Sequence, residues 1–180
     1  MKVLAAIWPF RPSRAEIDAE KLLATITQVA RQPGFYGENR VPDSLQGRLE
    51  LMMLHASLAF IRLRTDEGAA PLAQAFADKL FRQFDSGLRE DGVGDLTVPK
   101  RMKTIARSFY GRLDAYAAGL KANDRGALTE AIARNVFRTA PTNAGFAPAL
   151  AGYAAATVEK QASQATAALF DSDGWTLAPG

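Results

Sequence analysis

Length, composition and charge limit what this chain can be: it has 180 residues, of which 48% are hydrophobic, no cysteine and a formal net charge of +3. A chain of this length fits one domain and buries roughly 70% of its unfolded surface, so its core needs no disulfide, and the lack of cysteine also excludes a thiolate nucleophile and a cysteine zinc site. The small positive excess does not identify a nucleic-acid binder, although a local basic cluster could still meet an anionic partner.

The N-terminal segment, residues 1–12, begins with a short apolar run that ends at Pro9. A membrane-spanning helix needs roughly 20 apolar residues, and no small-residue cleavage site follows the run, so we expect a cytoplasmic protein without a secretory signal. Trp8 and Phe10 lie beside Arg11 and could touch a membrane surface, but a segment packed against the core is the favoured interpretation.

Residues 13–170 are dominated by the 3.6-residue period of amphipathic helices, which predicts an all-α fold, a single bundle of about six helices with short loops. No segment shows the alternation of a strand, and residues 171–180 are expected to form a frayed C-terminal tail. The expected helices run from Ser13 to about Gln32, from Asp43 to before Gly68, from about Ala70 to Glu90, from about Val98 to Lys121, from Asn123 to before Pro141, and from about Pro148 to Phe170. The expected N-caps are Ser13 in a capping box with Glu16, Asp43, Asp95 or Thr97, and Asn123 or Asp124.

The segment between the third and fourth helices is the most informative part of the sequence. Gly92 and Gly94 allow a tight turn, and acidic residues surround them. Lys100, Arg101 and Lys103 then crowd the first turn of the fourth helix, where the macrodipole disfavours each exposed cation by roughly 0.3 to 1 kcal/mol. Cations in such a place either pair with carboxylates of the fold or face an anionic partner. We therefore expect the turn and the basic helix start to form one partner-facing surface.

Signals of catalysis or cofactor binding are weak. The glycine pair lacks the third glycine of a dinucleotide site, since Thr97 stands in its place, and no phosphate-loop motif occurs. Carboxylates from Asp85 to Asp95 could hold a divalent ion, but ion pairs with neighbouring cations are the favoured interpretation. The single histidine, His55, borders the apolar stripe of the second helix and is expected to be a hydrogen-bonded structural residue. We expect no catalytic, metal-binding or cofactor-binding residues.

Several short motifs in the middle of the chain are similar to those of a known family. They are Phe35-Tyr36, Val41-Pro42-Asp43, Gly47-Arg48, Leu54-His55, Leu88-Arg89-Glu90, Gly92-Val93-Gly94-Asp95 and Phe109-Tyr110-Gly111-Arg112. In these motifs the chain resembles the ubiquinol-cytochrome c chaperone family, whose mitochondrial members assist newly made cytochrome b during assembly of respiratory complex III. The short chain is similar to bacterial homologues of the mitochondrial cytochrome b assembly chaperone.

The resemblance implies a non-enzymatic helper without cofactors, which binds cytochrome b or another membrane client in the cytoplasm or peripherally at the inner face of the cytoplasmic membrane. It implies no specific DNA target, and it leaves open the oligomeric state and any contact with the ribosome or a membrane surface. A groove lined by Met52, Met53 and the loop aromatics could shield the client. The candidate partner-binding residues are Phe35, Tyr36, Asp95, Lys100, Arg101, Lys103, Arg107 and Arg112.

Two other classes of function stay open from the residues alone. An RNA- or ribosome-binding helical module would use the basic face of the fourth helix, and its binding would depend steeply on salt. A metal enzyme would depend on the carboxylates from Asp85 to Asp95, and a divalent ion would change its thermal stability.

Overall fold

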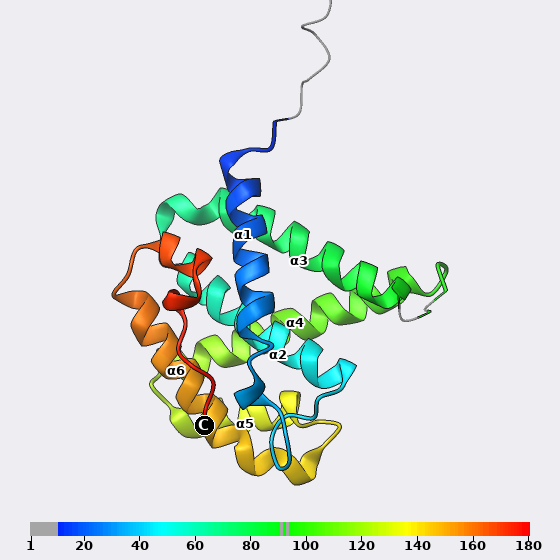
Figure 1. The fold of residues 1–180 in the computed structure, drawn as a ribbon, viewed down its shortest axis with the longest axis vertical. Helices are drawn as coiled ribbons and strands as arrows, with labels where there is room; N and C mark the ends of the chain where they lie inside the picture. The colour runs from blue at the N-terminus through cyan, green and yellow to red at the C-terminus, as the bar shows by residue number, and fades with distance from the viewer. Residues whose placement is uncertain (1–10, 91, 93) are drawn as a thin grey trace, which may run out of the picture.

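The chain forms a bundle of six α-helices in the computed structural model, which describes residues 11–90, 92 and 94–180 (Figure 1). The helices are α1 (Arg14–Val29), α2 (Leu45–Leu63), α3 (Ala70–Glu90), α4 (Val98–Lys121), α5 (Arg125–Val136) and α6 (Ala147–Ala162). The described part has no strand, only an isolated bridge between Tyr36 and Val41. The predicted all-α class is confirmed. The interpretation of Trp8 and Phe10 falls outside the described residues.

Helix α2 lies at the centre of the bundle and contacts each of the other five helices. From Met53 to Phe60 every residue is buried, including His55 and Ser57, so this stretch is enclosed all round. The Ser57 hydroxyl donates to the Met53 carbonyl at 2.7 Å, which satisfies the buried oxygen within the helix. A central helix of this kind explains why the apolar pattern of residues 45–63 is broader than a single stripe.

Helices α3 and α4 form an antiparallel hairpin that extends away from α5 and α6, with its turn at the outer end (Figure 1). Near the bundle the two helices bury Phe76 and Leu80 on one side and Phe109 on the other. Towards the turn burial decreases, and Met102 and Ile105 are only partly covered. In the described part of the chain, no helix is both long and apolar enough to cross a bilayer.

The observed helix caps agree with only part of the prediction. The capping box of Ser13 and Glu16 is confirmed, and so is Asp124, which accepts from the Ala127 amide at 2.9 Å. The predicted cap at Asp43 is wrong, because Ser44 caps α2 and Asp43 instead accepts from Arg48 Nε at 2.6 Å.

The predicted caps at the start of α4 are also wrong. Thr97 is the residue before the helix, but its φ of −94° and ψ of −27° are helical, and its side chain accepts no hydrogen bond from the first turn. The Asp95 carboxylate instead accepts from the Arg89 guanidinium. The cations at the start of α4 therefore follow an N-terminus that has no side-chain cap.

The C-terminal segment is ordered against the bundle and does not fray. Helix α6 ends at Ala162 rather than near Phe170, and two 3₁₀ turns follow it, Thr166–Phe170 and Ser172–Gly174. Trp175 is buried, and its indole Nε1 donates to the Leu169 carbonyl at 3.3 Å. Two further hydrogen bonds join this segment to α1 and to the loop after α1. Thr25 Oγ1 donates to the Phe170 carbonyl at 3.0 Å, and the Ala178 amide donates to Gln32 Oε1 at 2.8 Å. Buried aromatic area and these bonds outweigh the entropy of a free tail.

Candidate partner-binding surface

The connection between α3 and α4 makes a tight turn at the outer end of the hairpin (Figure 1). Gly92 has a φ of +79°, a conformation that residues with a side chain rarely adopt. The Gly94 carbonyl accepts hydrogen bonds from the amides of Thr97 at 2.8 Å and Val98 at 3.3 Å, and the Val98 side chain is buried. Leu96, inside this turn, is 99% exposed. The turn thus presents an apolar side chain to solvent on a backbone that is anchored on the side of α4.

Two carboxylates near the turn, Asp85 at the end of α3 and Asp95, bind Arg89. Arg89 Nε donates to Asp85 at 2.8 Å, and Nη1 of the same guanidinium donates to Asp95. The hydrogen bond to Asp85 is the main reason that the pKa of Arg89 is raised. Ion pairing, which the sequence favoured over a metal site, is confirmed for these two carboxylates, while Asp91 lies outside the described residues. Across the described chain, no three His, Asp or Glu side chains cluster as metal ligands would.

The first three turns of α4 carry a basic face, which consists of Lys100, Arg101, Lys103 and Arg107. Lys100, Lys103 and Arg107 are spaced three and four residues apart, so they follow one side of the helix, and Arg101 follows Lys100 about 100° further round the first turn. All four side chains are exposed. None of them forms an ion pair with another described residue. Cations at this helix end were expected either to pair with carboxylates of the fold or to face an anionic partner. Pairing with described carboxylates therefore does not explain the basic face.

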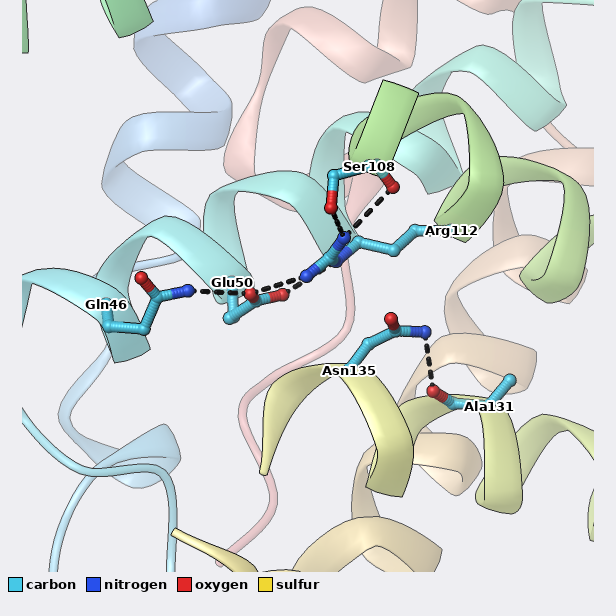
Figure 2. A network of polar contacts seen from close by, with 6 residues as sticks. All are labelled: Gln46, Glu50, Ser108, Arg112, Ala131 and Asn135. Carbon is cyan, nitrogen blue, oxygen red and sulfur yellow. Dashed lines mark hydrogen bonds and ion pairs between the residues drawn. The ribbon is translucent and has the colours of Figure 1, made fainter. Parts of the chain in front are cut away.

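Arg112 lies on the same helix but points into the bundle, towards α2 (Figure 2). Its Nε donates to Glu50 Oε2 at 2.8 Å and its Nη2 to Glu50 Oε1 at 2.7 Å, and the two side chains are only 7% and 1% exposed. Arg112 Nη1 also donates to the Ser108 carbonyl at 3.0 Å, and Gln46 Nε2 donates to Glu50 Oε1 at 2.8 Å. This bidentate pair ties α4 to α2. Arg112 is a predicted partner-binding residue, but in this structure it does not reach the surface.

The two aromatics of the loop before α2 have different environments. Phe35 is buried, and its ring meets those of His55 and Tyr153 edge-on at centroid distances of 5.2 and 5.0 Å. Tyr36 is half-buried and donates its hydroxyl to the Ala30 carbonyl at 2.7 Å, and burial raises the pKa of Tyr36 to about 12. Tyr36 lines an open pocket together with Arg31, Pro33, Gly37, Asp43 and Arg48. Of the two aromatics, only Tyr36 is therefore placed to contact a partner.

The turn that follows this loop lies directly over the first turn of α2. A Cβ added to Gly47 would lie 2.1 Å from the Pro42 carbonyl oxygen, so only glycine fits there. The Val41 amide donates to the Phe35 carbonyl at 3.1 Å, which closes the loop. Met53, expected in a client groove, is buried on α2, and Met52 is only partly covered. The groove predicted from Met52, Met53, Phe35 and Tyr36 is therefore largely filled by the core.

His55 has the structural role that the sequence favoured. Its Nδ1 lies 2.7 Å from the Leu51 carbonyl and its Nε2 lies 2.8 Å from the Tyr153 hydroxyl. Since a carbonyl can only accept, Nδ1 carries the proton and Nε2 accepts from Tyr153. The Trp175 ring lies 5.7 Å away, and burial lowers the pKa of His55 to about 4. The imidazole is therefore neutral at physiological pH and joins α2, α6 and the C-terminal segment.

The structure separates the predicted partner-binding residues into three groups. Asp95, Lys100, Arg101, Lys103 and Arg107 lie together around the α3–α4 turn, Tyr36 lies on the loop before α2, and Phe35 and Arg112 are buried. Sequence reasoning missed Leu96, although an apolar residue between Asp95 and Thr97 in a turn was a readable signal. It also missed Glu50, whose partner is 62 positions away along the chain and leaves no local pattern.

Comparison with known proteins agrees with the motifs. The sequence model of the family described as ubiquinol-cytochrome C chaperone matches residues 38–175, more than half of the chain. The chain belongs to the ubiquinol-cytochrome c chaperone family. The crystal structure of the Cbp3 homolog from Brucella abortus is similar to it, with a TM-score of 0.77, 38% sequence identity and 88% of each chain covered. A search of curated proteins found no match.

The region matched by the chaperone family includes the whole α3–α4 hairpin, Gly47, Arg112 and the buried Trp175. Phe35 and Tyr36 lie just before its first residue. Membership in a chaperone family favours a helper protein over an enzyme.

Proposed function

We propose that this chain is a non-enzymatic assembly chaperone that binds newly made cytochrome b during biogenesis of ubiquinol-cytochrome c reductase, complex III. Membership in the ubiquinol-cytochrome c chaperone family supports the chaperone role. The observation that carries the assignment to a surface is the exposure of Leu96 and of the basic face at the end of the hairpin. No packing contact within the described fold accounts for an apolar side chain and four cations there.

A newly made membrane subunit exposes apolar helices and polar loops until its cofactors and partners arrive. The end of the hairpin offers an apolar side chain and several cations, and Tyr36 with its pocket offers a second contact on the loop before α2. Asp95 holds Arg89 and thereby helps to fix the turn. Because the proposed client is a membrane protein, we place the chaperone peripherally at the inner face of the cytoplasmic membrane.

Affinity capture from the detergent-solubilised native membrane fraction tests this proposal. Tagged wild-type protein is expected to enrich cytochrome b, and the double reversal Lys103→Glu with Arg107→Glu is expected to capture much less of it. The matched control is Lys121→Glu with Arg125→Glu, which changes the net charge equally at the other end of α4 and the start of α5. Circular dichroism checks that both variants fold.

Two results would reject parts of the proposal. Without enrichment of cytochrome b by the wild-type protein, the assigned client is wrong. If the Lys103 and Arg107 reversals preserve both capture and complex III assembly in a correctly folded protein, the basic face is only solvated. Tyr36→Ala would then be the next variant, because the pocket beside Tyr36 is the other exposed candidate.

A second candidate function is supported by one observation. The four cations of the basic face form no ion pair with any described residue, as an RNA- or ribosome-binding surface would require. RNA binding that falls steeply with salt and is lost in the Lys103 and Arg107 reversals would support it. The described carboxylates Asp85 and Asp95 both bind Arg89, and nothing about their arrangement favours the metal enzyme.

A further inference from the structure

We propose that the hairpin tip, the described residues from Asp85 to Arg107, docks end-on onto a bilayer surface that contains anionic phospholipids. In this arrangement Leu96 enters the boundary between headgroups and acyl chains, and the basic face contacts the headgroup phosphates. The inference rests on the proposed function in one respect only, that the client is a membrane protein and the chaperone works beside the bilayer. Lipid would then be one partner of the surface to which client capture was assigned.

The charges of the hairpin tip are complementary to an anionic surface. In the sequence, residues 85–107 contain five cations, Arg89, Lys100, Arg101, Lys103 and Arg107, and four carboxylates, Asp85, Glu90, Asp91 and Asp95, which gives a net charge of +1. Four of the five cations belong to the basic face, so the positive charge is concentrated there. Asp85 and Asp95 both bind Arg89. The four cations of the basic face form no ion pair with any described residue. Each lysine or arginine near an anionic membrane surface strengthens binding by a factor on the order of five.

The geometry favours an end-on arrangement. Leu96 is 99% exposed in the turn at the outer end of the hairpin (Figure 1). From Lys100 to Arg107 the helix rises about 10 Å, which is close to the Debye length of about 8 Å at physiological salt, so most of the basic face lies within electrostatic reach of the surface. Asp114 lies seven residues after Arg107 on the same side of α4, and its side chain is 75% exposed. Asp114 lies 3.9 Å from the Arg64 guanidinium in an exposed ion pair, so a side-on arrangement would bring both charges to the surface. The preference for the end-on arrangement therefore rests on the position of Leu96 in the turn.

The same observations favour lipid over RNA. A cationic surface with an inserted apolar side chain is the combination by which peripheral proteins bind a bilayer interface. Leu96 has no comparable role on a phosphate backbone. The sequence from Asp85 to Arg107 contains no aromatic residue on which an exposed base could stack. The nearest one, Tyr110, is 46% exposed at the end of the basic face that lies away from the turn, and its ring packs beside that of Phe81 at a centroid distance of 6.1 Å.

Co-sedimentation of the purified full chain with vesicles is the first test. We expect binding to phosphatidylcholine vesicles that contain about 30% phosphatidylglycerol, no binding to pure phosphatidylcholine vesicles, and weaker binding at higher salt. Lys100→Glu with Lys103→Glu should weaken binding by at least a factor on the order of 25, since two favourable charges are lost and two unfavourable ones are added. The control, Lys121→Glu with Arg125→Glu, should bind as the wild type does. Equal binding to neutral vesicles, or no loss in the Lys100 and Lys103 reversals, would overturn the inference.

A position-specific probe is the second test, and the chain is suited to it because it contains no cysteine. Leu96→Cys carries an environment-sensitive fluorophore at the turn, and Leu177→Cys, at a side chain that is 85% exposed in the C-terminal segment, is the matched control. Anionic vesicles should shift the emission of the label at position 96 to shorter wavelength and leave that of the label at position 177 unchanged. A shift at neither position, or only at position 177, would contradict insertion of the hairpin tip.

These tests fail separately from the test of the proposed function, because cytochrome b capture is measured in detergent without a bilayer. Capture without vesicle binding overturns lipid docking and leaves the chaperone function standing. Vesicle binding through Leu96 and the basic face without capture supports lipid docking and rejects the client. Salt-sensitive RNA binding that depends on the basic face, with no vesicle binding, assigns the face to nucleic acid and overturns the inference.

Discussion

The buried pair of Glu50 and Arg112 gives the sharpest test of how the hairpin is held on the bundle. Arg112→Met keeps the length of the side chain but leaves the Glu50 carboxylate, 1% exposed, with only the Gln46 amide as a partner. Removing one member of a buried ion pair costs about 3–5 kcal/mol, because the other charge stays buried without compensation. That is a large part of a typical unfolding free energy of about 5–15 kcal/mol.

The opposite single substitution should cost less. In Glu50→Leu, Arg112 keeps its hydrogen bond to the Ser108 carbonyl, and its long side chain can reach towards solvent. The double variant, Glu50→Leu with Arg112→Met, buries no charge and should lie within about 2 kcal/mol of the wild type. The two substitutions should therefore be coupled by at least about 1 kcal/mol, and the coupling is larger by whatever Glu50→Leu costs on its own.

Urea denaturation followed by far-UV circular dichroism measures all four proteins of this cycle. The expected result is a lower midpoint with an unchanged denaturant slope for each single variant, and recovery in the double variant. Single variants within about 1 kcal/mol of the wild type, or effects that simply add, would refute the argument that the buried pair ties α4 to α2. Capture of cytochrome b by the folded double variant should be normal, because Arg112 is not at the surface.

Two further predictions concern the core around α2. Gly47→Ala should lower the unfolding free energy by about 2–3 kcal/mol, since its Cβ would lie 2.1 Å from the Pro42 carbonyl oxygen. Gly111→Ala in α4, where nothing lies within 4 Å of the added Cβ, should instead raise the unfolding free energy by about 0.5–1 kcal/mol. Equal effects of the two variants in urea denaturation would contradict the close contact at Gly47. The pKa of His55 is 6.5 in the unfolded chain and about 4 in the fold, so between these values the unfolded state binds one more proton than the folded state. The unfolding free energy should therefore fall as the pH drops below 6.5, by about 2 kcal/mol between pH 6.5 and pH 5. His55→Gln should remove this part of the pH dependence, and an unchanged profile would show that other groups cause it.

The elements that the sequence predicted best are those whose own periodicity and end signals determine them. Both α3 and α4 begin and end where predicted, because a glycine turn and Pro99 separate two clear apolar stripes. The end of α6 was predicted too late, since the alanine-rich sequence favours helix beyond Ala162. Tertiary contacts override that propensity: Trp175 is buried, and Gly174 lies so close to Ala168 that an added Cβ would be 2.0 Å from its carbonyl oxygen. Such contacts between distant segments cannot be read from local pattern.

The candidate surface shows the same division between local and long-range information. The basic face was predictable, because its spacing on α4 separates it from the apolar stripe. Arg112 was grouped with it, although its position seven residues after Ile105 places it on the edge of the inward-facing side. Its burial depends on Glu50, and a charge pairing between two helices has no signature in either helix alone. The sequence therefore identified the cations of the surface but not which arginine belongs to the core.

Once the structure assigns each motif of the chaperone family to its surroundings, the motifs fall into two kinds. Gly47 is required by the close approach of Pro42, Arg112 by Glu50, and His55 by Leu51 and Tyr153, so these residues are explained by packing inside the bundle. The turn from Gly92 to Asp95 is different. Gly92 needs its positive φ and Asp95 its pair with Arg89, but these features only shape an exposed turn.

Among the described residues between α3 and the first residue of α4, only Val98 is buried, and the Leu96 side chain is directed to solvent. A turn that is shaped by specific residues, yet contributes little to the core, is poorly explained by stability alone. Variants inside the bundle should therefore act on unfolding free energy, and variants of Leu96 and the basic face should act on partners. This separation is the reason to look for the function of the molecule at the end of the α3–α4 hairpin.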